Sequence, residues 1–176
     1  MEFLLRPAVP GDLGGILDVM ESARQILDCQ EWFVPDDEAY FASHIDSEEG
    51  FACGRSPGGE LAAYLPSAGG EAPDALGRRL GMESTQLHAC AQMDSCCVAP
   101  PYRGNSLEGR LMELAEQRLQ NWPGKPYIHC LGTVHPDNAA SLYSFFEPGV
   151  PHCCRRCAVL RRQAAPYPAK RPVIDR

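Results

Sequence analysis

The chain has 176 residues, of which 44% are hydrophobic and 22% are charged, and this composition is typical of one globular domain. Its formal net charge of −7 argues against nucleic acid as the main partner. No apolar run reaches the roughly 18 to 20 residues of a membrane span, and the N-terminus lacks a signal-peptide pattern. We therefore expect a cytoplasmic protein with no membrane partner.

Hydrophobic periodicity and turn residues predict elements in the order βααβββαβαβ. Asp12 follows a Pro-Gly turn and is a candidate N-cap for the first helix. Residues 66–85 are expected to form a loop with one short helix, Asp74–Leu80. In chain order, the predicted elements are a strand at Phe3–Ala8, a helix from Leu13 to Leu27, a helix beginning after Pro35, strands at Phe51–Arg55, Leu61–Leu65 and Leu87–Val98, a helix from Leu107 to about Asn121, a strand at Tyr127–Val134, a helix at Ala139–Phe146 and a strand at Cys153–Arg162.

This order is typical of an α/β domain with one curved mixed sheet. The residues after the last predicted strand read APYPAKRPVIDR, in which prolines and charges are frequent. Such a composition does not favour packing into a core. We expect one domain over residues 1–163 and an extended or disordered tail over residues 164–176.

The sequence contains nine cysteines. An odd count without an export signal argues against a disulfide framework, and most of these residues are expected to be small buried apolar side chains. Cys154 and Cys157 form a CxxC pair, but a structural zinc site usually takes two separated pairs of ligands. Because no second pair with matching spacing is present, no metal site is predicted.

Charge is distributed unevenly along the chain. Residues 28–49 contain eight acidic residues and no Lys or Arg, whereas residues 155–176 contain seven basic residues and one acidic residue. Two interpretations remain open. The segments form two solvated faces, or the acidic segment forms a wall that attracts a cationic amine substrate.

The segment YRGNSLEG (102–109) places small residues at the start of a predicted helix. A helix start leaves backbone N–H groups unpaired and carries partial positive charge, and small residues allow a ligand to approach those groups. An anion such as phosphate is therefore a suitable ligand. The alternative is an ordinary helix start that is capped by Asn105 or Ser106.

Three segments together resemble the GNAT superfamily of acyl-CoA-dependent N-acetyltransferases: RPAVPGDLGGILDVM (6–20), VAPPYRGNSLEGRLMELAEQRL (98–119) and VHPDNAASLYSFFEPG (134–149). The family's cofactor signature is Arg/Gln-x-x-Gly-x-Gly/Ala, and here Ser106 and Glu108 stand in the two glycine slots. Ser106 suits its slot unless the backbone there requires a positive φ. The Glu108 carboxylate would repel a pyrophosphate that it faced, so we expect it to point sideways.

The resemblance implies a GNAT-like sheet of about six to seven strands flanked by helices, with central parallel strands that splay apart. It implies that acetyl-CoA lies between Leu87–Val98 and Tyr127–Val134. There its pantetheine arm would pair with the backbone of Cys96–Val98, as in strand addition. The implied cofactor-binding residues are Cys96, Val98, Arg103, Gly104, Asn105, Ser106, Leu107, Glu108, Gly109, Asn138 and Phe145, and no metal is implied.

The reaction implied by the resemblance is direct transfer of an acetyl group to a primary amine of a small molecule or peptide. The Val98 N–H would face the thioester oxygen. Asp94, a carboxylate of the acidic segment or a water chain would accept the proton of the amine. The family's tyrosine acid does not carry over directly, because Phe145 stands in its slot and Tyr143 lies about 200° around the helix. Many relatives form dimers, so the resemblance allows a homodimer.

Two other functions remain open from the sequence. A CoA-binding sensor on the same fold is compatible with Phe145 and the two replaced glycines. A cysteine-based redox or metal protein is compatible with HCCRRC (152–157) and the adjacent pair Cys96 and Cys97.

Overall fold

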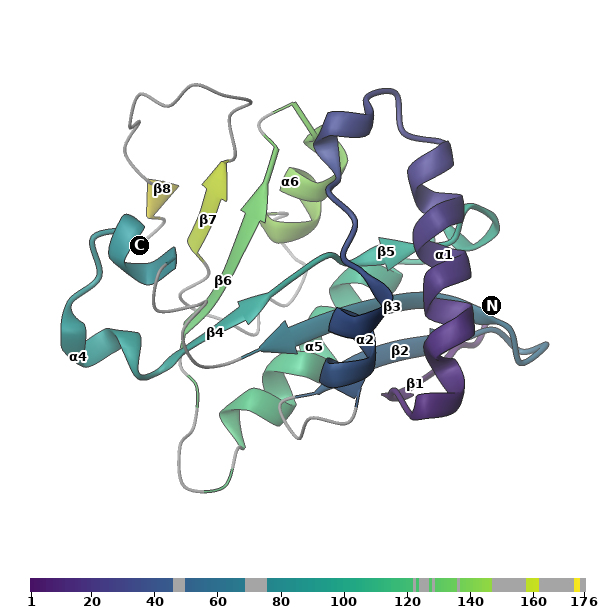
Figure 1. Ribbon diagram of the computed structural model, residues 1–176, viewed down its shortest axis with the longest axis horizontal. Coiled ribbons are helices and arrows are strands. Elements are labelled where there is room, and N and C mark those ends of the chain that lie inside the picture. Colours follow the sequence, from purple (N-terminus) through teal and green to yellow (C-terminus); the bar gives the residue numbers. More distant parts are fainter. Residues whose placement is uncertain are drawn as a thin grey trace.

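The structure is a computed structural model that describes residues 1–45, 50–68, 76–121, 123, 127, 129–135, 137–146, 158–161 and 173–174. Within these residues the strands form one mixed sheet, and helices cover both of its faces (Figure 1). The predicted α/β class and the mixed sheet flanked by helices are confirmed. No helix in these ranges is long and apolar enough to cross a membrane.

The N-terminal half of the chain supplies the antiparallel part of the sheet. Consecutive strands pair there in antiparallel fashion, and two helices cross over between the first and second strands. The elements are β1 (Leu4–Pro7), α1 (Leu13–Gln25), a single 3-10 turn at Gln30–Trp32, α2 (Glu38–Ile45), β2 (Phe51–Arg55) and β3 (Leu61–Ala68). Most predicted boundaries hold, but α2 begins three residues after Pro35 and β3 extends beyond Leu65.

The C-terminal half supplies the parallel part of the sheet. β4 pairs in parallel with β6, and β6 pairs in parallel with β7. The elements are α4 (Ser84–Leu87), β4 (Cys90–Met93), β5 (Cys97–Val98), α5 (Leu107–Gln120), β6 (His129–Val134), α6 (Ala139–Phe146), β7 (Ala158–Arg161) and β8 (Val173–Ile174). β8 pairs antiparallel with β7. The rest of the expected tail lies outside the described residues.

The prediction of one continuous strand at Leu87–Val98 is wrong. Leu87 ends α4, and the strand itself is divided into β4 and β5 by a β-bulge. Ser67 of β3 pairs with Met93, whereas Tyr64, three residues earlier, pairs with Cys97, four residues later. The extra residue bends β5 away from β6, and Figure 1 shows the two strands diverging beyond the end of β4.

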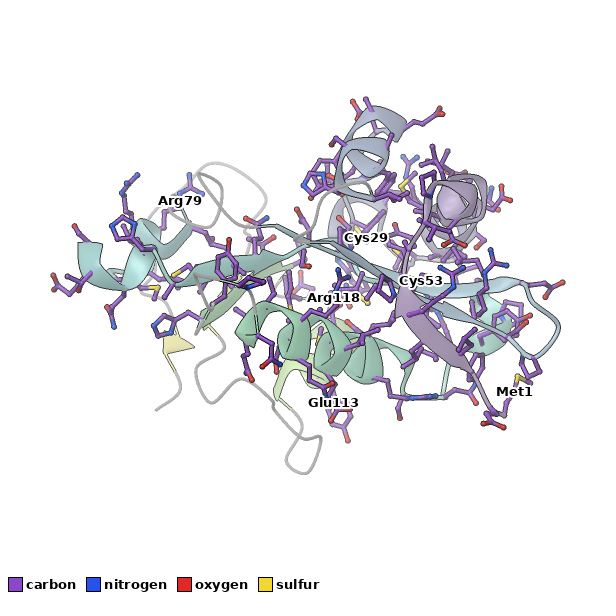
Figure 2. The ribbon with its side chains drawn as sticks, turned by 90° about the horizontal axis from the view of Figure 1, so that it is seen from below. Met1, Cys29, Cys53, Arg79, Glu113 and Arg118 are labelled. Atoms are coloured by element: carbon purple, nitrogen blue, oxygen red, sulfur yellow. The ribbon has the colours of Figure 1, made fainter. Side chains whose placement is uncertain are left out.

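Each strand of the central sheet contributes side chains to two cores, because successive side chains point to opposite faces. Leu65 belongs to the core beneath α5, with Leu111 and Leu119. Its neighbour Tyr64 belongs to the core beneath α1 and α2, with Ile16. Figure 2 shows α5 on one side of the sheet and α1 with α2 on the other.

Asp12 does not cap α1, although it occupies the N-cap position of that helix. Its buried carboxylate accepts hydrogen bonds from the Val9 N–H at 2.8 Å, from Arg6 at 2.7 and 2.9 Å and from Arg55 at 2.5 Å. The predicted capping role is therefore wrong. Asp12 links the first turn to β1 and β2, because its oxygens bind one arginine from each of those strands and not the N–H groups at the start of α1.

Candidate functional site

The turn before α5 is held by its own backbone and by Asn105. Gly104 has φ +76°, a left-handed conformation that glycine adopts without steric cost. The Asn105 side chain donates hydrogen bonds to the carbonyl oxygens of Tyr102 at 2.9 Å and Arg103 at 3.3 Å. Asn105 thus stabilises the turn, and it does not line the cavity described below.

Ser106 also adopts the left-handed conformation, with φ +54°. Serine would suit this slot only with a negative φ, and the backbone here has a positive one. The resulting strain costs roughly 1 kcal/mol. Ser106 occupies the N-cap position of α5 but makes no side-chain capping hydrogen bond. The alternative of an ordinary helix start that is capped by Asn105 or Ser106 is therefore wrong, since the N-cap residue of α5 makes no side-chain capping hydrogen bond.

The backbone of β5 presents an N–H group to the gap between β5 and β6. The Ala99 N–H donates to the Ala62 carbonyl oxygen of β3 at 2.8 Å. Because successive N–H groups of a strand point to opposite edges, the Val98 N–H points away from β3. The edge of β5 that faces β6 therefore carries a donor at the position predicted from the sequence.

A groove of about 730 Å³ lies between the start of α5, β5, α6 and the segment that follows α1. It brings together nine of the predicted cofactor-binding residues as well as Tyr143, which is 59% exposed. Asn105 is not in its lining, and the Phe145 side chain lies outside the described residues. The predicted residues that line the groove are Cys96, Val98, Arg103, Gly104, Ser106, Leu107, Glu108, Gly109, Asn138 and Tyr143.

Glu108 forms part of the wall of this groove. Its negative charge contributes to raising the pKa of the Cys96 thiol, after burial as the main cause. Arg103 and Arg110 line the same groove, and Arg24 reaches it from α1. The groove thus combines an uncapped helix start with three guanidinium groups, which can bind a polyanion. Its lining also contains three carboxylates, those of Asp28, Glu108 and Glu113.

A second, smaller cavity of about 180 Å³ adjoins the groove. The two share Cys96, Glu108 and Asn138 among their lining residues. The small cavity also contains Asp94, which directly follows β4, and Asp36, which precedes α2. The structure therefore places Asp94, the predicted base, beside Asp36 of the acidic segment. The sequence alone did not indicate that these two carboxylates line the same cavity.

Hydrogen bonds fix both carboxylates of the small cavity. Asp94 Oδ2 accepts from the Tyr40 hydroxyl at 2.9 Å and from Gln92 Nε2 at 3.1 Å. Asp36 Oδ2 accepts from the Ser95 hydroxyl at 2.8 Å. Burial raises the pKa of Asp36, the Ser95 hydrogen bond opposes that shift, and the charge of Asp94 adds to it. Burial and the Asp94 charge also raise the pKa of Tyr40, so its hydroxyl remains a donor.

Asn138 lies at the start of α6, as predicted, and lines both cavities. Its side-chain oxygen accepts a hydrogen bond from the Ser141 N–H at 3.2 Å, which caps the helix. This contact orients the amide of Asn138 at the junction of the two cavities.

Several lining residues were not predicted from the sequence. Trp32 and Phe33 belong to the segment between α1 and α2 and line both cavities. The Trp32 ring stacks on His135, with ring centroids 6.3 Å apart, although more than one hundred positions separate the two residues in the chain. No motif marks this pair, because only the tertiary fold brings the two loops together.

The cysteines near the groove have the character of buried thiols. Burial is the main cause that raises the pKa of Cys97 to about 12, and it raises that of Cys96 as well. Both stay protonated at neutral pH and are poor nucleophiles. In the described part of the chain no group of three or more His, Cys, Asp or Glu side chains could hold a metal ion. The HCCRRC segment lies outside the described residues.

Comparison with known families identifies a relationship over most of the chain. A model of the acetyltransferase (GNAT) family matches residues 18–146, which is more than half of the sequence. No curated protein sequence matches the chain.

Three solved structures illustrate the likeness in fold. The diaminobutyrate acetyltransferase EctA from Paenibacillus lautus, with 2,4-diaminobutyric acid and coenzyme A, has a TM-score of 0.58 at 12% identity, over 82% of this chain and 72% of that one. The yncA structure from Salmonella typhimurium, with its cofactor acetyl-CoA, has a TM-score of 0.57 at 15% identity, over 90% and 81%. The loading GNATL domain of CurA from Lyngbya majuscula has a TM-score of 0.53 at 15% identity, over 71% of this chain and 62% of that domain. At such identities the likeness shows the fold.

Proposed function

Since the chain belongs to the acetyltransferase (GNAT) family, we propose that it transfers the acetyl group of acetyl-CoA directly to a primary amine. The observation that carries this proposal is the junction of two cavities. A groove suited to a polyanion meets a small acidic cavity beside the backbone donor of Val98. A donor with a phosphorylated tail and an amine acceptor can therefore meet at one point.

The groove fits the phosphates of acetyl-CoA. In the proposal the N–H groups of Gly104 and of residues 106–109 bind the pyrophosphate. They lie at a helix start with no side-chain cap, where partial positive charge accumulates. The Arg103 N–H donates to the Pro100 carbonyl oxygen at 3.4 Å, and Asn105 does not line the groove. Arg110 and Arg24 line the same groove and add positive charge. Glu108 also lines the groove, so its negative charge lowers the net attraction for the pyrophosphate.

The diverging strands fit the pantetheine arm and the thioester. Cys96 and Val98 line the groove, and the edge of β5 that faces away from β3 offers backbone groups to an extended ligand. We assign the Val98 N–H as the donor to the thioester oxygen, where negative charge develops during acyl transfer. Asn138 and α6 close the opposite wall.

The thioester supplies an activated acetyl group: the amine nitrogen bonds to its carbonyl carbon while the carbon–sulfur bond breaks and the CoA thiolate leaves. The amine must lose a proton, and a primary amine has a pKa of about 10.4. We assign Asp94 as the proton acceptor, because its carboxylate lines the small cavity and is fixed by Tyr40 and Gln92. Tyr143 is the candidate proton donor to the thiolate, since it lines the groove. A thiol with a pKa near 8.5 needs little such help.

Thermal and chemical unfolding with acetyl-CoA test the proposal. A ligand at one hundred times its Kd raises the free energy of unfolding by about 2.7 kcal/mol, and we expect an increase of this size together with CoA release when an amine panel is added. An unchanged unfolding curve at millimolar acetyl-CoA contradicts the proposal.

A CoA-binding sensor is the second candidate function. It is favoured by the strained Ser106 and by Glu108 in the glycine slots of the signature. The two functions differ in turnover: a sensor gains stability from acetyl-CoA but forms no acetylated product and does not hydrolyse the thioester. Mass spectrometry of the amine panel separates them.

The remaining assignments complete the proposal. Residues 1–163 form the catalytic domain, and residues 164–176 follow it as an extension whose strand β8 pairs with β7. The protein works in the cytoplasm, and it forms a homodimer, as is common in the family. Sedimentation of the purified chain tests the dimer, and deletion of residues 164–176 with retained acetyl-CoA binding tests the domain boundary.

A further inference from the structure

We infer that the small cavity is the acceptor site and that it selects a small primary amine that carries no carboxylate group. This inference rests on the proposed function, because the acceptor must meet the acetyl group at the junction of the two cavities. It goes further in naming the chemistry that the site accepts and the chemistry that it rejects.

The charge of the cavity lining is one-sided. Asp36, Asp94 and Glu108 line it, and none of its described lining residues is Lys or Arg. A substrate carboxylate is normally bound by paired N–H donors of arginine. In the small cavity a substrate carboxylate would lose its water without gaining an arginine partner. It would also be repelled by the three carboxylates of the lining. An ammonium group finds the opposite situation, since every acidic side chain of the lining attracts it.

The two carboxylates nearest the bulge are fixed before a substrate arrives. Asp94 is held by Tyr40 and Gln92, and Asp36 is held by Ser95. They come from separate segments, one following β4 and one preceding α2, and converge on the same cavity. Both side chains are only partly exposed, so salt screens them less than surface charges. Their attraction for a cation therefore requires little rearrangement.

The other walls of the cavity suit the hydrocarbon part of a small amine. Trp32, Phe33, Val34 and Met93 contribute apolar surface. The Trp32 ring is fixed by its stack on His135, and an aromatic face attracts a nearby ammonium group. A cavity of about 180 Å³ is smaller than the roughly 300 Å³ of common drug-sized pockets. It therefore favours a small molecule.

The two cavities differ in the charges of their linings: acidic side chains line both, and basic side chains are found only in the lining of the larger groove. Arg24, Arg103 and Arg110 line only the larger groove, where Asp28, Glu108 and Glu113 balance their charge. An anionic donor therefore finds arginine partners in the larger groove and none among the described residues of the small cavity. The cationic acceptor is attracted to the acidic side of the junction. Asp94 first accepts a proton from the ammonium group. The neutral amine nitrogen then bonds to the acetyl carbon, the carbon–sulfur bond breaks, and the second proton of the nitrogen passes to the departing CoA thiolate. An acceptor carboxylate would have to share the small cavity with these acids.

Two matched ligand pairs test the inference by titration calorimetry with the wild-type protein in the absence of acetyl-CoA. Butylamine is compared with 4-aminobutyrate, and 1,4-diaminobutane with ornithine, so that each pair differs by one carboxylate. We expect the member without a carboxylate to bind at least about tenfold more tightly in both pairs, as for the loss of a charged contact. Equal or tighter binding of 4-aminobutyrate and ornithine overturns the inference.

The variant Asp36→Asn connects this preference to the cavity. We expect it to weaken binding of 1,4-diaminobutane about tenfold, to raise KM for this amine more than it lowers kcat, and to leave the Kd for acetyl-CoA unchanged. Asp18→Asn, the same change at an exposed position of α1, serves as the matched control and should change none of these values. Identical amine affinity in the wild type and Asp36→Asn contradicts the inference.

The readouts separate failure of the inference from failure of the proposed function. If the protein binds acetyl-CoA but lacks the expected amine preference, the assignment of the acceptor site is contradicted and the proposed acetyltransferase function stands. If the protein shows the expected amine preference but does not bind acetyl-CoA, the proposed function is contradicted and the small cavity is still a site for cations.

Discussion

At the residue scale, Ser106 shows a conflict between sequence and backbone. Its φ of +54° is one that glycine adopts freely and serine adopts at a cost. We predict that Ser106→Gly raises the free energy of unfolding by about 0.5 to 1 kcal/mol, since relief of strain exceeds the entropy that glycine adds to the unfolded chain. Urea unfolding measures this difference.

Ser106→Ala is the control for that substitution. It keeps the strained backbone and removes a hydroxyl that makes no capping hydrogen bond, so stability should stay within about 0.5 kcal/mol of the wild type. If alanine stabilises the protein as much as glycine does, backbone strain is not the cause.

Asp12 is a second residue whose role is set by its partners. Burial opposes its ionised form, but hydrogen bonds from Arg6, the Val9 N–H and Arg55 hold its pKa well below its usual range. Its contribution to stability is therefore complete above the ordinary carboxyl pKa of about 3.9 and is lost as pH falls toward the lower folded-state value. We predict that Asp12→Asn costs about 3 kcal/mol at pH 7, because two arginines lose their partner.

Unfolding of the wild type and Asp12→Asn across acidic pH checks this assignment. The difference in the free energy of unfolding should be constant above about pH 5 and should narrow as pH falls further, since the unfolded-state pKa is about 3.9. Asp18→Asn, at an exposed position, should show a difference below about 0.5 kcal/mol. A gap that stays constant down to the lowest pH at which the protein folds contradicts the ionic role of Asp12.

At the element scale, the bulge between β4 and β5 determines which backbone groups the sheet uses and which it leaves for a ligand. The Val98 N–H points away from β3, and the Ala99 N–H pairs with Ala62. We predict that Val98→Pro lowers kcat by about one hundredfold, the usual effect of losing one oxyanion donor, with little loss of stability. Steady-state kinetics and urea unfolding give the two values.

Neighbouring substitutions separate the possible causes. Ala99→Pro removes an N–H that the sheet uses, so it should lower stability, as a lost ladder hydrogen bond does. Val98→Ala keeps the donor and trims the side chain, so kcat should stay near the wild-type value. If Val98→Ala loses as much activity as Val98→Pro, the side chain of Val98 and not its N–H matters for the reaction.

At the scale of the whole molecule, the site is formed by segments from both halves of the chain. Trp32 and Phe33 from the segment after α1 line the same groove as the start of α5 and α6. We predict that acetyl-CoA slows amide hydrogen exchange at 26–33 and at 103–109, because both segments border its groove. α4 does not line the groove, and its exchange should stay unchanged, which hydrogen-exchange mass spectrometry can resolve.

Much of the fold follows from local pattern. The SPGG turn between β2 and β3, the period of α1 and α5 and the breaks at prolines each depend on neighbouring residues. The boundaries of these elements are therefore predicted to within a few positions. The segment after Leu87 is different. Its residues are as apolar as those of a strand, and the bulge that divides it arises from pairing with β3, which a single segment does not encode.

The sequence by itself determined the family resemblance and the acidic character of residues 28–49, because these depend on residue type and spacing along the chain. It also predicted the start of α5 as a place for phosphate. Only the tertiary structure decided that Ser106 is strained, that Asp12 bridges two strands, and that Asp36, Trp32 and His135 meet beside Asp94. These features depend on contacts between segments far apart in the chain. The packing of helices and loops around a bent sheet sets such contacts, and no local pattern records them.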